Sequence, residues 1–169
     1  MKTIIKNLRL PVLLLSMSML TPSLALAAKE VKKSPQLLTA SEVVNMYKDK
    51  TWRWPSGGGR FDSQGRRFTA MTEENGKKSI GEGTWSVDNL GKMCMNATWT
   101  TDGKAAKART CFSHGRLGNV IYQKRLPMGD WYVFRSAKPR ASDEFSKLVN
   151  TDSVTVQALA AKQVMSVKK

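Results

Sequence analysis

Apolar and polar residues alternate with a period of two through most of the chain between Thr51 and Ser136. The alternating segments are short, and turn-forming residues separate them, which predicts an antiparallel meander of about seven strands. A meander of this length hides its edges by closing or curling, so we expect a mainly β fold, either a small barrel or a strongly curled sheet. Before the strands, the capping-box pattern Thr39–Glu42 and the apolar Val43, Val44 and Tyr47 predict a short N-terminal helix.

The dipeptide Asn75-Gly76 is a preferred two-residue hairpin turn. Centring the strand pairing on it places Phe68 opposite Gly83 and Ala70 opposite Gly81, so that an aromatic ring covers a residue without a side chain. The same register sorts side chains by their chemistry. One face receives Phe68, Ala70, Trp85 and Val87, and the other receives Arg67, Thr69, Glu82 and Thr84.

A second turn, Asp102-Gly103, lies midway between the two cysteines of the chain. Pairing about this centre puts Cys94 opposite Cys111 at a non-hydrogen-bonded position, where Cα atoms are about 4.5 Å apart, at the lower limit for a disulfide. An even number of cysteines in an exported protein favours a structural bridge over a catalytic or metal-binding role. The register also gathers apolar residues on one face: Met93, Met95, Ala97, Trp99 and Phe112.

The segment 1–27 has the three zones of a cleavable signal peptide. Lys2, Lys6 and Arg9 precede an apolar stretch at 10–20 that is too short to span a bilayer, and a small-x-small pattern at 25–27 follows. We therefore expect export, with a periplasmic or secreted mature protein that has no further transmembrane segment. An N-terminal anchor that is not cleaved is the competing interpretation.

The mature chain has the length of one domain. We expect a flexible basic lead at 28–38, a β domain with its N-terminal helix at 39–137, and a peripheral basic tail at 138–169. Within the tail, Ser142 suits the cap of a short helix, and the pattern at 151–167 fits either a frayed helix or a strand.

Positive charge dominates the composition. The 28 Lys and Arg residues outnumber the 13 Asp and Glu residues, and the mature chain keeps a formal net charge of +12 once the three signal-peptide cations are removed. Such a charge favours anionic partners in general, such as a glycan, a lipid or another component of the cell envelope. The cations are scattered, which a need for solubility alone also explains. No stacking motif accompanies them, so we expect no binding of nucleic acid.

Basic and aromatic residues of the predicted sheet are the candidates for ligand contacts. Arg67, Lys107 and Arg109 share the polar face with several hydroxyl and amide side chains, and Arg53 extends this surface. Alternation does not tell whether that face meets solvent or a barrel lumen. Two further tryptophans fit the apolar core. The full candidate set is Trp52, Arg53, Trp54, Arg67, Lys107, Arg109 and Trp131.

Patterns typical of catalytic or metal sites are not found in the sequence. Gly57–Gly59 is not followed by the lysine and hydroxyl residue of a phosphate-binding loop, and a bent strand explains these glycines better. One histidine and two mutually suited cysteines do not make a zinc site, and a disulfide removes the thiolate that a Cys111–His114 pair needs. We expect His114 to line a turn or the rim of the sheet. We therefore predict no catalytic residue, metal or cofactor.

A set of residues spread over the predicted sheet is similar to one protein family. The set consists of Thr51-Trp-Arg-Trp54, Gly57-Gly-Gly59, Phe61, Gly65, Phe68, Gly83-Thr-Trp85, Gly91, Cys94, Trp99, Cys111-Phe112 and Trp131-Tyr-Val-Phe134. With these residues the chain resembles a bacterial exported family known as domain of unknown function 995, over roughly Thr39 to Ser136. The resemblance implies a secreted or periplasmic protein and brings no catalytic residues. We expect the tail after Ala137 to lie outside the shared pattern.

Three functional classes remain open at this point. The leading hypothesis is a non-enzymatic binding module for an anionic or amphipathic envelope ligand, held by basic residues and exposed aromatic rings. The alternative is a protein-interaction factor or a host-directed secreted factor. An enzyme ranks third, because a site assembled only in three dimensions leaves no motif in the sequence.

Overall fold

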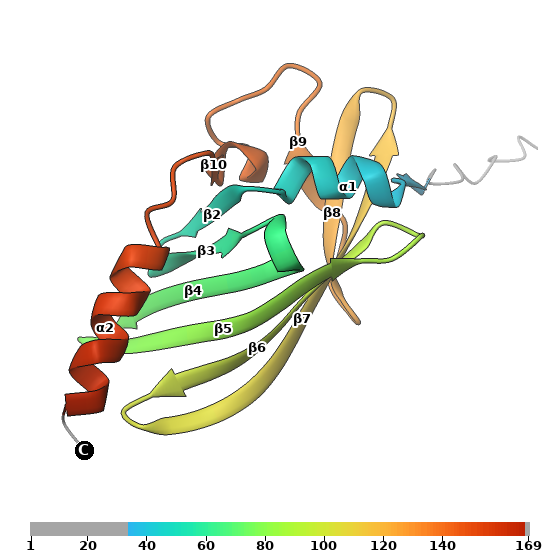
Figure 1. The fold of residues 1–169 in the computed structure, drawn as a ribbon. Helices are drawn as coiled ribbons and strands as arrows, with labels where there is room; N and C mark the ends of the chain where they lie inside the picture. Colours follow the sequence, from blue (N-terminus) through green and yellow to red (C-terminus); the bar gives the residue numbers. More distant parts are fainter. Residues whose placement is uncertain (1–33, 168–169) are drawn as a thin grey trace, which may run out of the picture. The chain divides into compact units, whose positions relative to one another are not determined.

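The computed structural model describes residues 34–167 (Figure 1). The expected signal peptide at 1–27 and most of the expected lead lie outside the described residues. The strands are β1 (Gln36–Leu37), β2 (Lys50–Trp54), β3 (Gly57–Phe61), β4 (Arg67–Glu74), β5 (Lys77–Val87), β6 (Lys92–Thr101), β7 (Lys104–Leu117), β8 (Val120–Leu126), β9 (Tyr132–Arg135) and β10 (Leu148–Val149). The helices are α1 (Ala40–Tyr47), α2 (Thr155–Val167) and two short 3-10 turns, η1 (Gln64–Arg66) and η2 (Glu144–Lys147).

All the strands belong to one antiparallel sheet. Its order is β10-β2-β3-β4-β5-β6-β7-β8-β9, and β1 pairs with β7 outside this path. The sheet curls strongly, because the ring of Trp52 on β2 contacts the ring of Phe112 on β7 at 5.3 Å between centroids although four strands stand between them. The expected mainly β, curled meander is confirmed, and it forms a half-barrel. We call the concave face of this sheet the inner face and the convex face the outer face.

Both hairpin registers predicted from the turns are confirmed. Phe68 pairs with Gly83, and Cys94 pairs with Cys111 across β6 and β7. The two cysteines form a disulfide with a Cα–Cα distance of 4.1 Å. The predicted apolar face is the inner face, since Phe68 and Trp85 are buried in the core. The predicted polar face is the outer face.

The ring of Phe68 covers a glycine of the neighbouring strand β3. A Cβ atom added at Gly59 would lie 2.6 Å from this ring. At Gly81 the covering ring is that of Trp99, which a Cβ would approach to 3.0 Å. Pairing partners alone do not determine these contacts, because a long side chain also reaches the neighbouring strand on its other side.

Helix α1 covers part of the inner face. The predicted capping box is present, because the Thr39 backbone nitrogen donates to Glu42 while the Glu42 nitrogen donates to the Thr39 hydroxyl. Val43 and Tyr47 point into the core and are fully buried. The main apolar core, which lies between α1, β9 and the inner face, contains Leu38, Val43, Tyr47, Trp52, Phe61, Phe68, Ala70, Trp85, Met93, Ala97, Ile121, Phe134 and Leu148.

Where the structure describes it, the expected tail at 138–169 is not peripheral. Its strand β10 pairs with β2, and Leu148 enters the main core. Helix α2 then crosses the outer face (Figure 1). There, Ala158 and Ala161 pack against Ile80 of β5. The segment docks for two physical reasons. Strand β10 pairs with the edge of β2 that would otherwise lack a partner, and α2 shields apolar side chains of the outer face from water.

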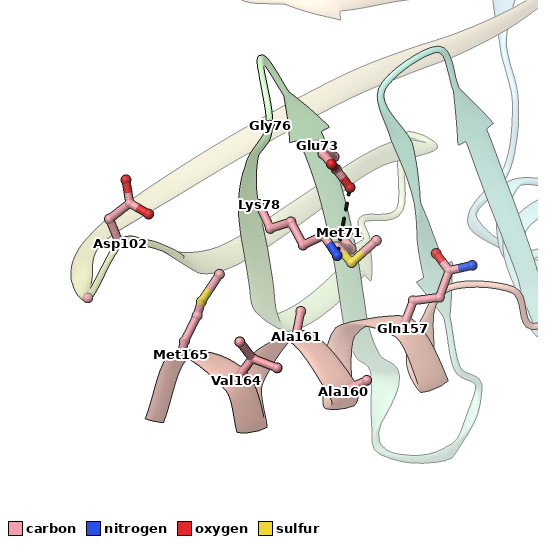
Figure 2. A pocket seen from close by; sticks show the side chains of 11 residues that line it. Met71, Glu73, Gly76, Lys78, Asp102, Gln157, Ala160, Ala161, Val164 and Met165 are labelled. Carbon is pink, nitrogen blue, oxygen red and sulfur yellow. Dashed lines mark ion pairs between the residues drawn. The ribbon is translucent and has the colours of Figure 1, made fainter. Parts of the chain in front are cut away.

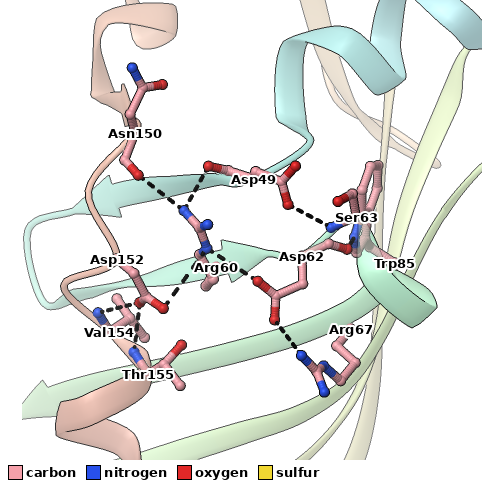
Figure 3. A network of polar contacts seen from close by, with 10 residues as sticks. All are labelled: Asp49, Arg60, Asp62, Ser63, Arg67, Trp85, Asn150, Asp152, Val154 and Thr155. Atoms are coloured by element: carbon pink, nitrogen blue, oxygen red, sulfur yellow. Dashed lines mark hydrogen bonds and ion pairs between the residues drawn. The ribbon is translucent and has the colours of Figure 1, made fainter.

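Arg60 of β3 holds the connection between β10 and α2 against the sheet (Figure 3). One guanidinium nitrogen donates to the backbone oxygens of Asp49 at 2.7 Å and Asn150 at 3.2 Å. The Nε atom lies 3.3 Å from Asp62 and 3.9 Å from Asp152. The side chain is mostly buried, so these charged contacts stabilise the packing of the segment more than an exposed pair would.

The expected lead at 28–38 also enters the fold where it is described. Gln36 and Leu37 pair with Arg116 and Gly115 of β7, and Leu38 is buried. Within residues 34–167, no helix has both the length and the apolar character needed to cross a membrane.

Candidate functional site

A groove of about 450 Å³ opens on the outer face over β5, β6 and β7. It exists because strand alternation points the polar residues of three adjacent strands to this face, around a floor that includes Gly83, Ala97 and Ala108. We call it the outer groove. Its polar lining consists of Glu82, Thr84, Asn96, Thr98, Lys107 and Arg109.

The outer groove is positively charged. Its one carboxylate, Glu82, is neutralised by Lys162 of α2, whose Nζ lies 2.8 and 2.9 Å from the two carboxylate oxygens. Lys107 and Arg109 are exposed, and within residues 34–167 neither has a carboxylate partner. Arg109 also lies over the disulfide, with its Nη2 atom 3.7 Å from the Cys94 sulfur. The groove therefore presents two cations that are available to an anion.

The seven residues predicted to contact a ligand do not form one site. The structure brings Lys107 and Arg109 together in the outer groove. Arg67 lies on the same face opposite Thr84, but it contacts Asp62 at 3.4 Å, and Arg53 is exposed on the outer face of β2.

The predicted tryptophans lie elsewhere. Trp52 is a core residue and not an exposed contact, because the sheet curls around it and its Nε1 donates to Glu144 at 2.8 Å. Trp54 stands beside it on the inner face. Trp131, just before β9, has the Lys124 ammonium 5.0 Å from its ring centroid.

A second hollow of about 670 Å³ lies between α2 and the tips of two hairpins on the outer face, and we call it the helix pocket (Figure 2). Met71 of β4 and Ala161, Val164 and Met165 of α2 provide apolar walls. Around them are polar residues of the hairpins, including an ion pair between Glu73 and Lys78 at 3.8 Å. The sequence alone does not indicate this pocket, because its helical wall belongs to the C-terminal segment, which we expected to be peripheral.

His114 is fully buried in the core and does not line a turn or the rim, as we had expected. The expectation placed it correctly on the face of Phe112 but did not include α1, which covers that part of the inner face. The Nδ1 atom of His114 lies 3.5 Å from the backbone oxygen of Gly91. Since a carbonyl oxygen only accepts hydrogen bonds, we assign the ring proton to Nδ1 and leave Nε2 as an acceptor.

A directed chain of hydrogen bonds leads from the surface to this ring. The Tyr132 hydroxyl donates to Oε1 of Gln123, whose Nε2 donates to the Tyr47 hydroxyl at 2.7 Å and also lies 2.8 Å from Nε2 of His114. The Tyr47 hydroxyl in turn donates to Nε2 of His114 at 2.9 Å. Each polar group of this chain has a partner within the protein, which is typical of a core network that specifies packing.

Burial perturbs the acid–base behaviour of this chain. It lowers the pKa of His114 to about 4, so the ring is neutral at ordinary pH. It also raises the pKa of Tyr47, and burial together with the nearby Glu144 carboxylate raises the pKa of Tyr132 to about 12. The three groups are thus held in their uncharged forms.

No metal centre is present among the described residues, where no three His, Cys, Asp or Glu side chains gather to hold an ion. The two cysteines are joined, and the histidine ring is enclosed in the core. The outer groove and the helix pocket are two hollows of the described surface with room for a ligand.

The fold and these sites define a disulfide-bridged, half-barrel β protein with a basic groove on its convex face. The chain belongs to the family described as "Protein of unknown function (DUF995)", whose family model matches residues 13–154. The resemblance found in the sequence is confirmed. The match extends past residue 136, so the expectation that the family pattern ends before the C-terminal segment was wrong. No match is found among curated proteins or among solved structures.

Proposed function

We propose that this protein is an exported, non-enzymatic binding module whose outer groove holds an anionic ligand of the cell envelope. The observation that supports the proposal most is the placement of Lys107 and Arg109 beside hydroxyl and amide side chains in a groove whose only carboxylate is already paired. Both cations are also candidates from the alternation of the sequence, and their shared position in the lining of this groove supports the proposal.

The chemistry of the groove suits a phosphate or carboxylate group. The guanidinium of Arg109 offers a planar pair of donors that matches two oxygens of such a group, and Lys107 adds a second charge. Thr84, Asn96 and Thr98 provide donors and acceptors for neighbouring hydroxyls of a ligand. A volume of about 450 Å³ is within the range of small-molecule sites, so a phosphorylated or acidic sugar, or a lipid head group, fits the space.

Export is supported by two features of the chain. The disulfide between Cys94 and Cys111 is typical of proteins that fold in an oxidising compartment. The N-terminal 27 residues have the zones of a signal peptide. We therefore propose that the mature protein acts in the periplasm or outside the cell.

We propose a binding role and not an enzymatic one because the cysteine thiols and the histidine ring are already engaged within the protein. Both thiols are oxidised, and the Nε2 atom of His114 is occupied by internal donors beneath α1. Neither the outer groove nor the helix pocket contains a histidine or a cysteine. The outer groove instead provides positive charge and hydrogen-bonding side chains, which suit the recognition of an anionic ligand.

The test is calorimetric titration and thermal melting of the mature protein with glycerol 3-phosphate, glucose 6-phosphate and digalacturonate. At least one of these probes should bind, and binding should weaken at about 0.5 M salt because screening reduces the attraction of exposed charges. The double variant K107A/R109A should bind about 100-fold more weakly, since each lost charge-assisted contact is worth about 1.4 kcal/mol or more.

The matched control is K104A/K138A, which removes two exposed lysines outside the outer groove and changes the net charge equally. It should bind like the parent protein. An equal loss of affinity in the two double variants would show that binding depends on the net charge of the protein and not on the outer groove. If none of the three probes bound to the parent protein, the proposed function would be wrong.

A further inference from the structure

The two hollows of the outer face have complementary chemistry. The outer groove carries cations, whereas the helix pocket has apolar walls built from two methionines and the helix residues Ala161 and Val164. Methionine side chains adapt their shape to flexible apolar ligands. Val164 is 58% exposed, so this wall of the pocket is available to a ligand.

The hollows are also neighbours on the same elements. Lys78 of the helix pocket and Glu82 of the outer groove are four residues apart on β5, which corresponds to about 13 Å along the strand. On α2, Ala161 lines the pocket, and the next residue, Lys162, binds Glu82 in the groove. One turn of α2 therefore contacts both hollows.

The charges of this surface favour one orientation of a ligand. At the rim of the helix pocket, Glu73 lies near Lys78, and Asp102 lies 3.7 Å from Lys77, so positive and negative charges are balanced there. In the outer groove, by contrast, the Lys162 contact neutralises the acid and leaves two cations in excess. An anionic group would lie in the groove, and an apolar chain would lie in the pocket.

From these observations we propose that the outer face binds a single-chain anionic amphiphile, with its phosphate or carboxylate head in the outer groove and its acyl chain in the helix pocket under α2. This proposal rests on the proposed function, because it uses the same groove for the head group. It adds the ligand class and a second part of the site, and it makes α2 a functional element.

The experiment compares two probes that share a head group. The mature protein is titrated with glycerol 3-phosphate and with 1-acyl-glycerol 3-phosphate at concentrations where the amphiphile is monomeric. The acylated probe should bind at least about 100-fold more tightly, because each methylene removed from water contributes about 0.8 kcal/mol and only a few need to enter the pocket.

Two variants locate the acyl chain. V164W places a large ring in the helix pocket from an exposed helix position, and it should weaken binding of the acylated probe at least about tenfold while leaving glycerol 3-phosphate unaffected. L159W is the matched control, since Leu159 is 54% exposed on α2 but does not line the pocket. It should bind both probes like the parent protein.

The outcomes separate this inference from the proposed function. Equal affinity for the two probes would overturn the inference and leave the groove proposal standing. If both tryptophan variants weakened the acylated probe equally, or if neither did, the helix pocket would not be the acyl site. Failure of both probes to bind would remove this inference and the phosphate-binding form of the proposed function together.

Discussion

The buried ring of His114 predicts a specific dependence of stability on pH. Its pKa is about 4 in the folded protein, against about 6.5 for an exposed histidine. Between these two values the unfolded chain binds a proton that the folded chain does not bind, so the free energy of unfolding rises with pH across this window. The contribution is fully present above about pH 6.5 and is lost progressively as the pH falls towards 4.

The size of the effect follows from the difference of the two pKa values. The full contribution is about 3 kcal/mol, since one pKa unit corresponds to 1.36 kcal/mol. Between pH 7 and pH 5, roughly 2 kcal/mol of it should disappear. The groups that face the ring are Tyr47, Gln123, Phe134 and the Gly91 carbonyl, and none of them becomes charged in this range.

The carboxylates with lowered pKa values do not cause a comparable change in the free energy of unfolding between pH 5 and pH 7. The pKa values of Glu42, Asp49, Asp88 and Asp143 are lowered mainly by hydrogen bonds, so their stabilising contributions are lost only as the pH falls through and below the ordinary carboxyl range. The range from pH 5 to pH 7 therefore isolates the histidine.

The assay is urea unfolding of the disulfide-intact mature protein at pH 7 and pH 5, for the parent and for H114Q. The parent should lose about 2 kcal/mol between these pH values, while H114Q, which is less stable at pH 7, should lose less than about 0.5 kcal/mol. An equal loss in both proteins would refute the reasoning. So would a measured histidine pKa near 6.5 in the folded parent protein.

Three further predictions concern stability. Replacing Cys94 and Cys111 together by serine should lower the free energy of unfolding by about 3 kcal/mol, the value expected for a loop of this size, and adding reductant to the parent should have the same effect in denaturant titrations. R60A should release the C-terminal segment from the sheet, seen as faster limited proteolysis after residue 149, whereas R53A, at an exposed position of the neighbouring strand, should leave the cleavage rate unchanged. G83A should destabilise the β5–β6 pairing by more than about 2 kcal/mol in thermal melts, because the new methyl group would meet a backbone oxygen of β6; a Tm equal to that of the parent would contradict the close approach.

The parts of the fold that sequence reasoning predicted are those governed by short-range rules. The turn Asn75-Gly76 sets the register of one hairpin, and Asp102-Gly103 sets that of the next, so the alternation of side chains and the disulfide follow directly. The same rules place Lys107 and Arg109 on one face of β7. The capping box of α1 is equally local.

What sequence reasoning did not predict depends on contacts between distant segments. The burial of His114 requires α1 to cover the inner face, and the burial of Trp52 requires the sheet to curl until β2 meets β7. The docking of α2 had a signal in Val154, Ala158 and Ala161, which recur at helical spacing. That pattern does not reveal which surface receives the helix, so the helix pocket could not be predicted.

The central claim is that an anion binds over β5, β6 and β7 on the convex side of the sheet, and mapping amide chemical shifts during a titration with glycerol 3-phosphate tests it most directly. We predict that the largest shifts will cluster at Thr84, Asn96, Thr98 and Arg109, with little change at Trp99 on the inner face. Shifts centred on the inner face, or spread evenly over the exposed lysines, would contradict the account.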